Sequence, residues 1–253
     1  MGLGDLQFAL GQTRRRVQLK MNRRVSATRP AALIHSPTSV VPGQARFVAI
    51  AGNIGAGKST LTAFLERKFE IKPFYEPNDD NPYLTDFYAD MRRYSFHSQM
   101  YFLSAKFRAH LQLAKLLQEQ PATVFVQDRT IYEDAEIFAR TQHTLGVMSA
   151  RDHATYANMY LAIRETLPKP DLLIYLRCSL KGIRRRIRQR GRPAEQSMDL
   201  KYLEALQEAY EMWFAQYDLG PTLVIETEHL DYLANMIDRL DFIKALEQLL
   251  HRT

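Results

Sequence analysis

Residues 52–59 read Gly-Asn-Ile-Gly-Ala-Gly-Lys-Ser, which is the spacing Gly, four residues, Gly-Lys-Ser. An apolar run precedes this stretch, and a segment of helical periodicity follows it. Glycines at this spacing let backbone amides turn inward around phosphate groups, and the helix N-terminus adds positive charge. Lys58 is then able to reach the β- and γ-phosphates of a nucleotide, and the Ser59 hydroxyl to ligate Mg2+. The sequence therefore predicts a phosphate loop made of Gly52, Asn53, Ile54, Gly55, Ala56, Gly57, Lys58, Ser59 and Thr60.

Short apolar runs alternate with segments of helix length along the rest of the chain. The runs are rich in β-branched, aromatic and leucine side chains, and they lie at 47–51, 72–75, 123–127, 171–176 and 222–225. The helical segments lie at 58–69, 81–119 with a break near 90, 132–166 with a break near 146, 179–190, 199–216 and 231–250. This alternation predicts an α/β fold of the P-loop NTPase type, in which a five-stranded parallel sheet carries helices on both faces. Ligands of such sheets bind at the carboxyl ends of the strands.

The net charge of +6 is concentrated near the N-terminus. Residues 1–46 hold eight Lys or Arg and one acid, Asp5, so the remainder is close to neutral. We expect residues 1–44 to form a basic, mostly disordered extension and residues 45–253 to form the folded domain. Three interpretations of the extension stay open: an organellar transit peptide, a stretch upstream of a true start at Met21, and a basic arm that touches nucleic acid. The near-neutral body argues against a requirement for nucleic acid.

Other features narrow the setting in which the chain works. No apolar run approaches the roughly 20 residues that cross a bilayer, so no membrane partner is expected. The single cysteine, Cys178, excludes an intramolecular disulfide and fits a reducing compartment. The seven histidines show no metal-ligand spacing, so Mg2+ arriving with ATP is the metal we expect. We therefore expect a cytoplasmic protein, or an organellar one if the extension is a transit peptide.

Charged residues follow the second and third apolar runs. Glu76 lies just past the second run, and Asp128 and Arg129 lie just past the third. Because the carboxyl ends of parallel strands meet at one edge of a sheet, these side chains should converge on the phosphate loop. Glu76 is suited to accept a proton from an attacking hydroxyl, Asp128 to hold Mg2+ or its waters, and Arg129 to neutralise a transferring phosphoryl group. The alternative for each acid alone is a helix cap or an ion pair.

Six arginines crowd residues 184–192, after the fourth apolar run. Such a run usually marks a solvated helix face, an import signal or a nucleic-acid patch. In a protein with a phosphate loop, an arginine-bearing segment here is predicted to act as a lid that closes over the donor phosphates and excludes water.

The helical segment before the third apolar run has polar and apolar side chains on the same face. Gln99, Phe102, Leu103 and Lys106 lie at offsets of zero, three, four and seven, so they share one helix face. A glutamine beside apolar side chains is suited to pair with a base that shows a donor beside an acceptor, as adenine and cytosine do. The alternative is a core stripe from which Lys106 reaches solvent.

From about residue 46 onward the chain resembles the deoxynucleoside kinases, the group of deoxycytidine, deoxyguanosine and bacterial deoxyadenosine kinases. The resemblance rests on motifs that occur in order: the loop at 52–60, Tyr75-Glu76-Pro77, Tyr94-Ser95-Phe96 to Gln99, residues 128–134 (Asp-Arg-Thr-Ile-Tyr-Glu-Asp), Arg190-Gly191-Arg192 and Tyr202-Leu203-Glu204. It implies ATP-dependent phosphorylation of the 5′-hydroxyl of a deoxynucleoside in nucleotide salvage, and it makes residues 45–253 the kinase domain.

The resemblance also implies roles for single residues. Glu76 would be the general base, and Arg129 would support the phosphoryl group. Gln99 would bond the base, and Tyr88 with Glu195 would hold the sugar 3′-hydroxyl. The lid would grip ATP through Arg186, Arg190 and Arg192. Members are commonly homodimers through their long helices, which apolar side chains at Leu111, Leu113, Leu116 and Leu117 would permit.

Two positions depart from the animal members of that family. Asp128 stands where they carry glutamate, which resembles the bacterial branch and keeps a carboxylate for magnesium. Lys106 stands where the cytidine and guanosine kinases carry an arginine opposite the aspartate matched by Asp134, so the charges remain but the planar fork is lost. We expect a purine deoxynucleoside as substrate, with deoxycytidine still open.

Two rival functions share the predicted fold. A nucleoside monophosphate kinase, such as a thymidylate kinase, needs cations for the acceptor phosphate, whereas the acceptor side here offers Glu76. A non-catalytic assembly subunit need not keep loop, base and lid together, and this sequence keeps all three.

Overall fold

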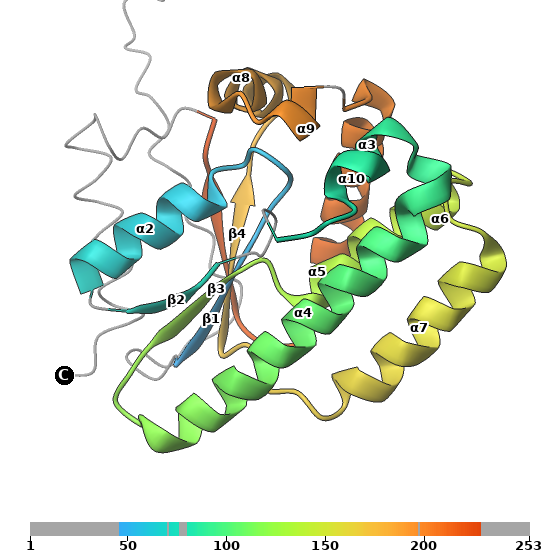
Figure 1. Cartoon of the computed structure of the whole chain (residues 1–253). Helices are drawn as coiled ribbons and strands as arrows, with labels where there is room; N and C mark the ends of the chain where they lie inside the picture. Colours follow the sequence, from blue (N-terminus) through green and yellow to red (C-terminus); the bar gives the residue numbers. More distant parts are fainter. Residues whose placement is uncertain (1–45, 70, 76–79, 197, 229–253) are drawn as a thin grey trace, which may run out of the picture. The chain divides into compact units, whose positions relative to one another are not determined.

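The computed structural model describes residues 46–69, 71–75, 80–196 and 198–228 (Figure 1). Five strands run in one parallel sheet: β1 (Phe47–Ala51), β2 (Lys72–Phe74), β3 (Phe125–Asp128), β4 (Leu172–Arg177) and β5 (Thr222–Glu226). Their order is β2-β3-β1-β4-β5. The predicted five-stranded parallel sheet is therefore confirmed, and β1, which leads into the phosphate loop, lies at its centre.

The helices follow the periodic segments, with two additions. They are α2 (Lys58–Phe69), α3 (Leu84–Ala89), α4 (Met91–Glu119), α5 (Ile131–Glu133), the π-helix η1 (Asp134–Ala139), α6 (Arg140–Thr144), α7 (Ala150–Arg164), α8 (Leu180–Arg190), α9 (Pro193–Gln196) and α10 (Leu200–Ala215). The predicted break near residue 90 falls at Asp90, whose carboxylate caps α4 by accepting from the Arg93 amide. Neither the π-helix nor α9 was predicted. The helix expected at 231–250 lies outside the described residues.

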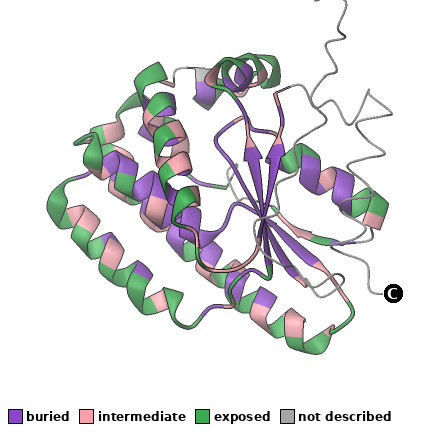
Figure 2. Cartoon of the chain, turned by 180° about the vertical axis from the view of Figure 1, so that it is seen from behind, coloured by how far each residue is buried: buried purple, intermediate pink, exposed green. Residues whose placement is uncertain are grey.

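Both faces of the sheet are covered by helices, as predicted. Successive side chains of a strand point to opposite faces, so β1 contributes to two cores. Val48 and Ile50 pack in the core that holds Leu61 and Leu65 of α2. Ala49 and Ala51 belong to the larger core, to which α10 and η1 contribute more buried residues than any other element. Figure 2 shows β1, β3, β4 and β5 almost wholly buried between these layers, whereas the edge strand β2 is exposed or half-buried.

The leucines of the long helix α4 were expected to be available for a contact with a second chain, but most of them pack within this chain. Leu113 is buried with Phe47 and Phe125, and Leu116 and Leu117 pack against that cluster. The expectation that Leu113 serves a contact between chains is therefore wrong, because its side chain is part of the core. Leu111, on another face of the helix, is 48% exposed.

The extension predicted at 1–44 lies outside the described residues. Within the described part of the chain, no helix has the length and apolar character needed to cross a membrane.

A buried histidine on α4 makes the stability of the fold sensitive to acid. His110 is fully buried, donates from Nδ1 to the Lys106 carbonyl oxygen at 3.0 Å, and packs edge-on against Phe47 and Tyr132. Burial lowers the pKa of His110 from 6.5 to about 4. Between these values the unfolded chain binds more protons, so the free energy of unfolding should fall as pH drops from 6.5 toward 4, by up to about 3 kcal/mol.

Urea unfolding at a series of pH values measures this effect. His110→Gln should lose stability at neutral pH and should flatten the slope between pH 6.5 and 4. The exposed His97 is the matched control on the same helix, and His97→Gln should keep the wild-type slope. A His110→Gln slope equal to that of the wild type would contradict the assignment.

Candidate active site

The phosphate loop joins the end of β1 to the start of α2, at the centre of the sheet. Gly52, Gly55 and Gly57 have φ angles of 150°, 80° and 105°, a region that side chains with a Cβ rarely adopt. A Cβ at Gly52 would also lie 2.8 Å from the Leu176 carbonyl oxygen. The backbone conformation therefore favours glycine at all three positions, and at Gly52 the close approach of β4 requires it as well.

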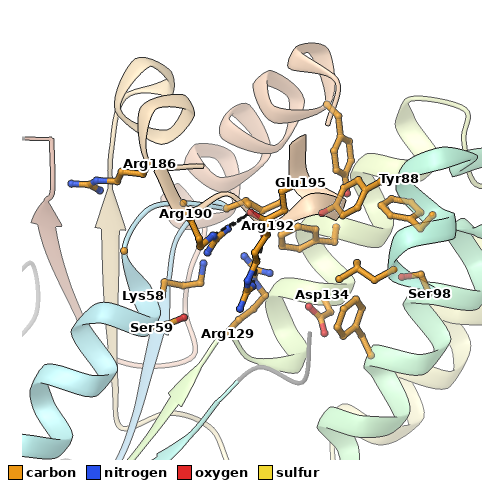
Figure 3. A pocket seen from close by; sticks show the side chains of 18 of the residues that line it. Lys58, Ser59, Tyr88, Ser98, Arg129, Asp134, Arg186, Arg190, Arg192 and Glu195 are labelled. Atoms are coloured by element: carbon orange, nitrogen blue, oxygen red, sulfur yellow. Dashed lines mark hydrogen bonds and ion pairs between the residues drawn. The ribbon is translucent and has the colours of Figure 1, made fainter. Parts of the chain in front are cut away.

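Lys58 reaches back across the loop that precedes it. Its Nζ donates to the carbonyl oxygens of Gly52 at 2.8 Å and Asn53 at 3.1 Å. This places the ammonium group inside the turn of the loop, where phosphate oxygens of a nucleotide would be acceptors for it. Figure 3 shows Lys58 and Ser59 side by side at this edge of the cavity.

Ser59 and Asp128 form the pair that the sequence predicts for a magnesium ion. The Ser59 hydroxyl donates to Asp128 Oδ2 at 2.6 Å. Asp128 Oδ1 is buried and has no hydrogen-bond partner among the described residues. A hydroxyl beside a carboxylate with a spare oxygen is the donor set that Mg2+ takes next to nucleotide phosphates. The residues present therefore fit the ion.

Arg129 has an unusual backbone. Its φ is 61°, the one positive φ of a residue other than glycine within the described part of the chain, and its amide donates to the Ile50 carbonyl oxygen at 3.1 Å. Its guanidinium lies 4.4 Å from the centre of the Phe138 ring. A residue other than glycine in this region costs of order 1–3 kcal/mol, a cost that occurs mostly at functional sites. Here the conformation turns the arginine from the end of β3 into the cavity (Figure 3).

A single cavity of about 700 Å³ connects the loop with α3 and α4. Its donor side is lined by loop residues, Ile54, Gly55, Gly57, Lys58, Ser59 and Thr60. Its acceptor side is lined by predicted substrate residues, Tyr88, Gln99, Phe102 and Asp134, and Arg129, Arg190, Arg192 and Glu195 border it as well. The structure thus brings most of the predicted site residues together around one space (Figure 3). Glu76, the predicted base, lies outside the described residues.

The helix face that carries Gln99, Phe102, Leu103 and Lys106 lies partly in the wall of this cavity and partly behind it. Gln99 is buried, and its Oε1 has no hydrogen-bond partner among the described residues. Asp134 lines the cavity and forms an ion pair with Lys106 at 2.8 Å, with both side chains at most 4% exposed. Lys106 itself does not line the cavity. It therefore acts on a ligand through Asp134, and the alternative in which it reaches solvent is wrong because its side chain is 1% exposed.

The predicted lid arginines divide into two groups. Arg190 pairs with Glu195 at 2.5 Å, and Arg192 approaches the same carboxylate at 3.7 Å. Arg186 instead donates to the Ala56 carbonyl oxygen at 2.9 Å and to the hydroxyl and carbonyl oxygens of Thr227. In Figure 3 its guanidinium points away from those of Arg190 and Arg192. Arg186 therefore ties the phosphate loop to the end of β5 in this structure.

The sequence interpretation assigned no role to several residues near the cavity. Gln142 joins two helices, because its side chain accepts from the Ser95 hydroxyl at 2.8 Å and donates to the Tyr202 hydroxyl at 3.2 Å. Gln142 and Tyr202 line the cavity together with Phe87 and Phe138. Apolar periodicity offered no signal for these contacts, because they arise only when α4, α6 and α10 pack together.

The comparisons with known proteins agree with this geometry. The sequence profile of the deoxynucleoside kinases matches residues 48–251. A deoxyadenosine/deoxycytidine kinase of Bacillus subtilis is 38% identical over 201 residues, which cover 76% of this chain and 90% of the relative. A deoxyguanosine kinase of Lactobacillus acidophilus is 37% identical, with 76% and 85% covered. Among solved structures, deoxyadenosine kinase from M. mycoides with bound dCTP is similar with a TM-score of 0.67 at 32% identity, covering 79% of this chain and 98% of that one.

Proposed function

Because this chain belongs to the deoxynucleoside kinase family, we propose that it transfers the γ-phosphoryl group of ATP to the 5′-hydroxyl of a purine deoxynucleoside, with deoxycytidine as a second acceptor. The observation that carries the proposal is the cavity that the phosphate loop lines together with Gln99 and Asp134, where Lys106 pairs with Asp134 from behind the wall. One end offers amides and a cation to phosphates, and the other offers polar side chains to a base. Such a space is suited to hold donor and acceptor end to end.

In this reaction one charged residue accepts the proton and two others stabilise the transferring phosphoryl group. We assign Glu76 as the base that takes the proton of the 5′-hydroxyl as its oxygen attacks phosphorus. Lys58 and Arg129 balance the negative charge that spreads over the transferring group. ADP leaves with the electron pair of the broken P–O bond, and the product is the 5′-monophosphate.

Mg2+ is proposed at Ser59 and Asp128, where it would neutralise the donor phosphates. The contact between the two side chains at 2.6 Å and the spare Asp128 Oδ1 support this. Asp128→Asn removes the anionic ligand, so it should raise the Mg2+ concentration needed for half-maximal rate. An unchanged requirement would contradict the assignment.

We assign the sugar and the remaining phosphates to the border of the cavity. Tyr88 and Glu195 would hold the 3′-hydroxyl, while Arg190 and Arg192 would close over ATP. Glu195 is 9% exposed and engages both arginines, so it links the sugar to the lid. Arg186 lines the same cavity. We propose that it acts at the donor phosphates in part through the Ala56 carbonyl oxygen of the loop, to which it donates.

Base choice is proposed to follow from hydrogen-bond matching. The amide of Gln99 offers a donor beside an acceptor, and the Asp134 carboxylate offers acceptors. Adenine, guanine and cytosine carry an exocyclic amino group, which thymine lacks. The curated relatives described above are named for deoxyadenosine, deoxyguanosine and deoxycytidine, in line with this choice.

We also propose that the protein is cytoplasmic and forms a homodimer. Leu111 on α4 and Met159 and Leu161 on α7 are 46–49% exposed, on two helices that pack against each other. We propose that a second copy of this chain covers apolar side chains on this pair of helices. A mass of 29.3 kDa by light scattering, that of a single chain, would contradict the dimer.

An acceptor panel tests the proposed substrate. The four deoxynucleosides and the four ribonucleosides are each supplied with ATP and Mg2+, and kcat/KM is measured for each. We expect deoxyadenosine or deoxyguanosine to rank first and thymidine to rank well below. Thymidine as clearly the best acceptor would overturn the assignment of Gln99 and Asp134.

A further inference from the structure

A carboxylate lies buried directly behind the phosphate loop. Glu133, the last residue of α5, has no exposed surface and does not line the cavity. Its Oε1 accepts from the Gly52 amide at 3.4 Å and from the Tyr210 hydroxyl at 3.0 Å. Its Oε2 accepts from the Thr130 amide at 3.0 Å. One side chain therefore joins the start of the phosphate loop, the turn after β3 and α10.

The charged groups near Glu133 include two residues proposed to act in the reaction, Lys58 and Arg129. Burial is the largest influence on Glu133 and raises its pKa, and the positive charges of Arg129, Lys58 and Lys106 and the bond from the Thr130 amide offset only part of that rise. The Gly52 amide, the Thr130 amide and the Tyr210 hydroxyl all donate to this side chain. Glu133 is thus a buried acceptor of three hydrogen bonds beside two cations of the site, Lys58 and Arg129.

The two backbone amides that donate to Glu133, those of Gly52 and Thr130, lie next to segments that carry site residues. Gly52 is the first residue of the loop that carries Lys58, and Thr130 directly follows Arg129 with its strained backbone. The separation of these two amides bears directly on how Lys58 and Arg129 stand relative to each other. A misplacement of about 1 Å in such groups is enough to cost about 100-fold in rate.

We propose that Glu133 is a positioning residue for phosphoryl transfer, which holds the phosphate loop and the Arg129 turn at one separation and anchors both to α10 through Tyr210. It acts through Lys58 and Arg129 and touches neither donor nor acceptor. The inference rests on the proposed kinase reaction and adds to it a residue outside the cavity. The alternative is that Glu133 only stabilises the fold as a buried helix-capping residue.

A matched pair of variants separates the two roles. Glu136, three residues further on, also accepts two side-chain hydrogen bonds, from Tyr160 at 2.6 Å and Trp213 at 3.1 Å. These bonds join it to α7 and α10 and not to the phosphate loop. Glu133→Gln should lower kcat by about 10-fold or more, with KM for the deoxynucleoside within twofold of wild type. Glu136→Gln should lose thermal stability and keep kcat within twofold. Equal kcat values for the two variants would overturn the proposal.

If Glu133→Gln does not fold, a variant that removes only one of the hydrogen bonds to Glu133 tests the same proposal. Tyr210→Phe removes one hydrogen bond to Glu133 and keeps the ring, so kcat should fall about threefold to fivefold. Tyr175→Phe is its control, because the Tyr175 hydroxyl donates to Glu211 at 2.9 Å rather than to Glu133. A Tyr210→Phe kcat equal to that of Tyr175→Phe would overturn the proposal. A wild type without activity on deoxynucleosides would instead refute the kinase reaction on which it rests.

Discussion

Replacing Lys58 with alanine is expected to lower kcat by about 100-fold to 1,000-fold. Its ammonium group is held inside the loop by two carbonyl oxygens, and the loop glycines adopt conformations that fix this turn. A preorganised cation at the donor phosphates stabilises charge in the transition state, and water that replaces it is not preorganised. KM for the deoxynucleoside should change far less, because Gln99 and Asp134 are at the other end of the cavity.

The control for this variant is an exposed lysine on the same helix. Lys68 lies in the last turn of α2, and Lys68→Ala should keep kcat within twofold. Steady-state kinetics with ATP and the preferred deoxynucleoside measure both. A Lys58→Ala enzyme with kcat within fivefold of wild type would show that the loop lysine does not act on the transferring phosphate.

Replacing Lys106 with methionine is expected to lower the free energy of unfolding by about 3–5 kcal/mol. Lys106 and Asp134 pair at 2.8 Å with almost no exposure, so removing the lysine leaves a buried carboxylate without its cation. The double variant Lys106→Met with Asp134→Leu should recover much of the loss, because two apolar side chains of similar volume replace the pair. The double variant should fold and yet lose its preference among bases, since Asp134 lines the cavity.

Urea unfolding of the single and double variants gives these free energies. Lys115 provides the control on the same helix, because its pair with Glu119 is 74% and 52% exposed, and Lys115→Ala should cost less than about 0.5 kcal/mol. A Lys106→Met protein within 1 kcal/mol of wild type would contradict the role of the buried pair.

Local patterns were enough to predict the sheet and the loop. The spacing from Gly52 to Ser59 lies within one strand-to-helix turn, so it specifies the phosphate site without knowledge of the rest of the chain. The third strand was predicted two residues early at its start and one residue early at its end. Pairing with β1 decides its true limits, since Asp128 is in register with Ile50.

Tertiary contacts decided what the sequence did not predict. Arg186 and Arg190 are one helical turn apart, yet Arg186 bonds Ala56 and Thr227 while Arg190 bonds Glu195. The role of Leu113 as a core residue depends on the packing of α4 against Phe47 and is invisible in its own helix.

Glu133 could have been found in part. Thr130 followed three residues later by Glu133 is a capping pattern, and the Glu133 side chain indeed accepts from the Thr130 amide. Its bonds to Gly52 and Tyr210 span 81 and 77 residues, and no local pattern reports contacts of that range.

One assay tests directly whether this chain phosphorylates a deoxynucleoside with Glu76 as the base. ATP labelled at the γ-phosphate and Mg2+ are supplied with each deoxynucleoside and each deoxynucleoside monophosphate, for the wild type and for Glu76→Gln. We predict label transfer to the 5′-position of a deoxynucleoside, a loss of orders of magnitude in Glu76→Gln, and unchanged ATP binding in that variant. Turnover of monophosphates alone, or a wild type that binds ATP and transfers no label, would contradict the proposed phosphorylation of a deoxynucleoside.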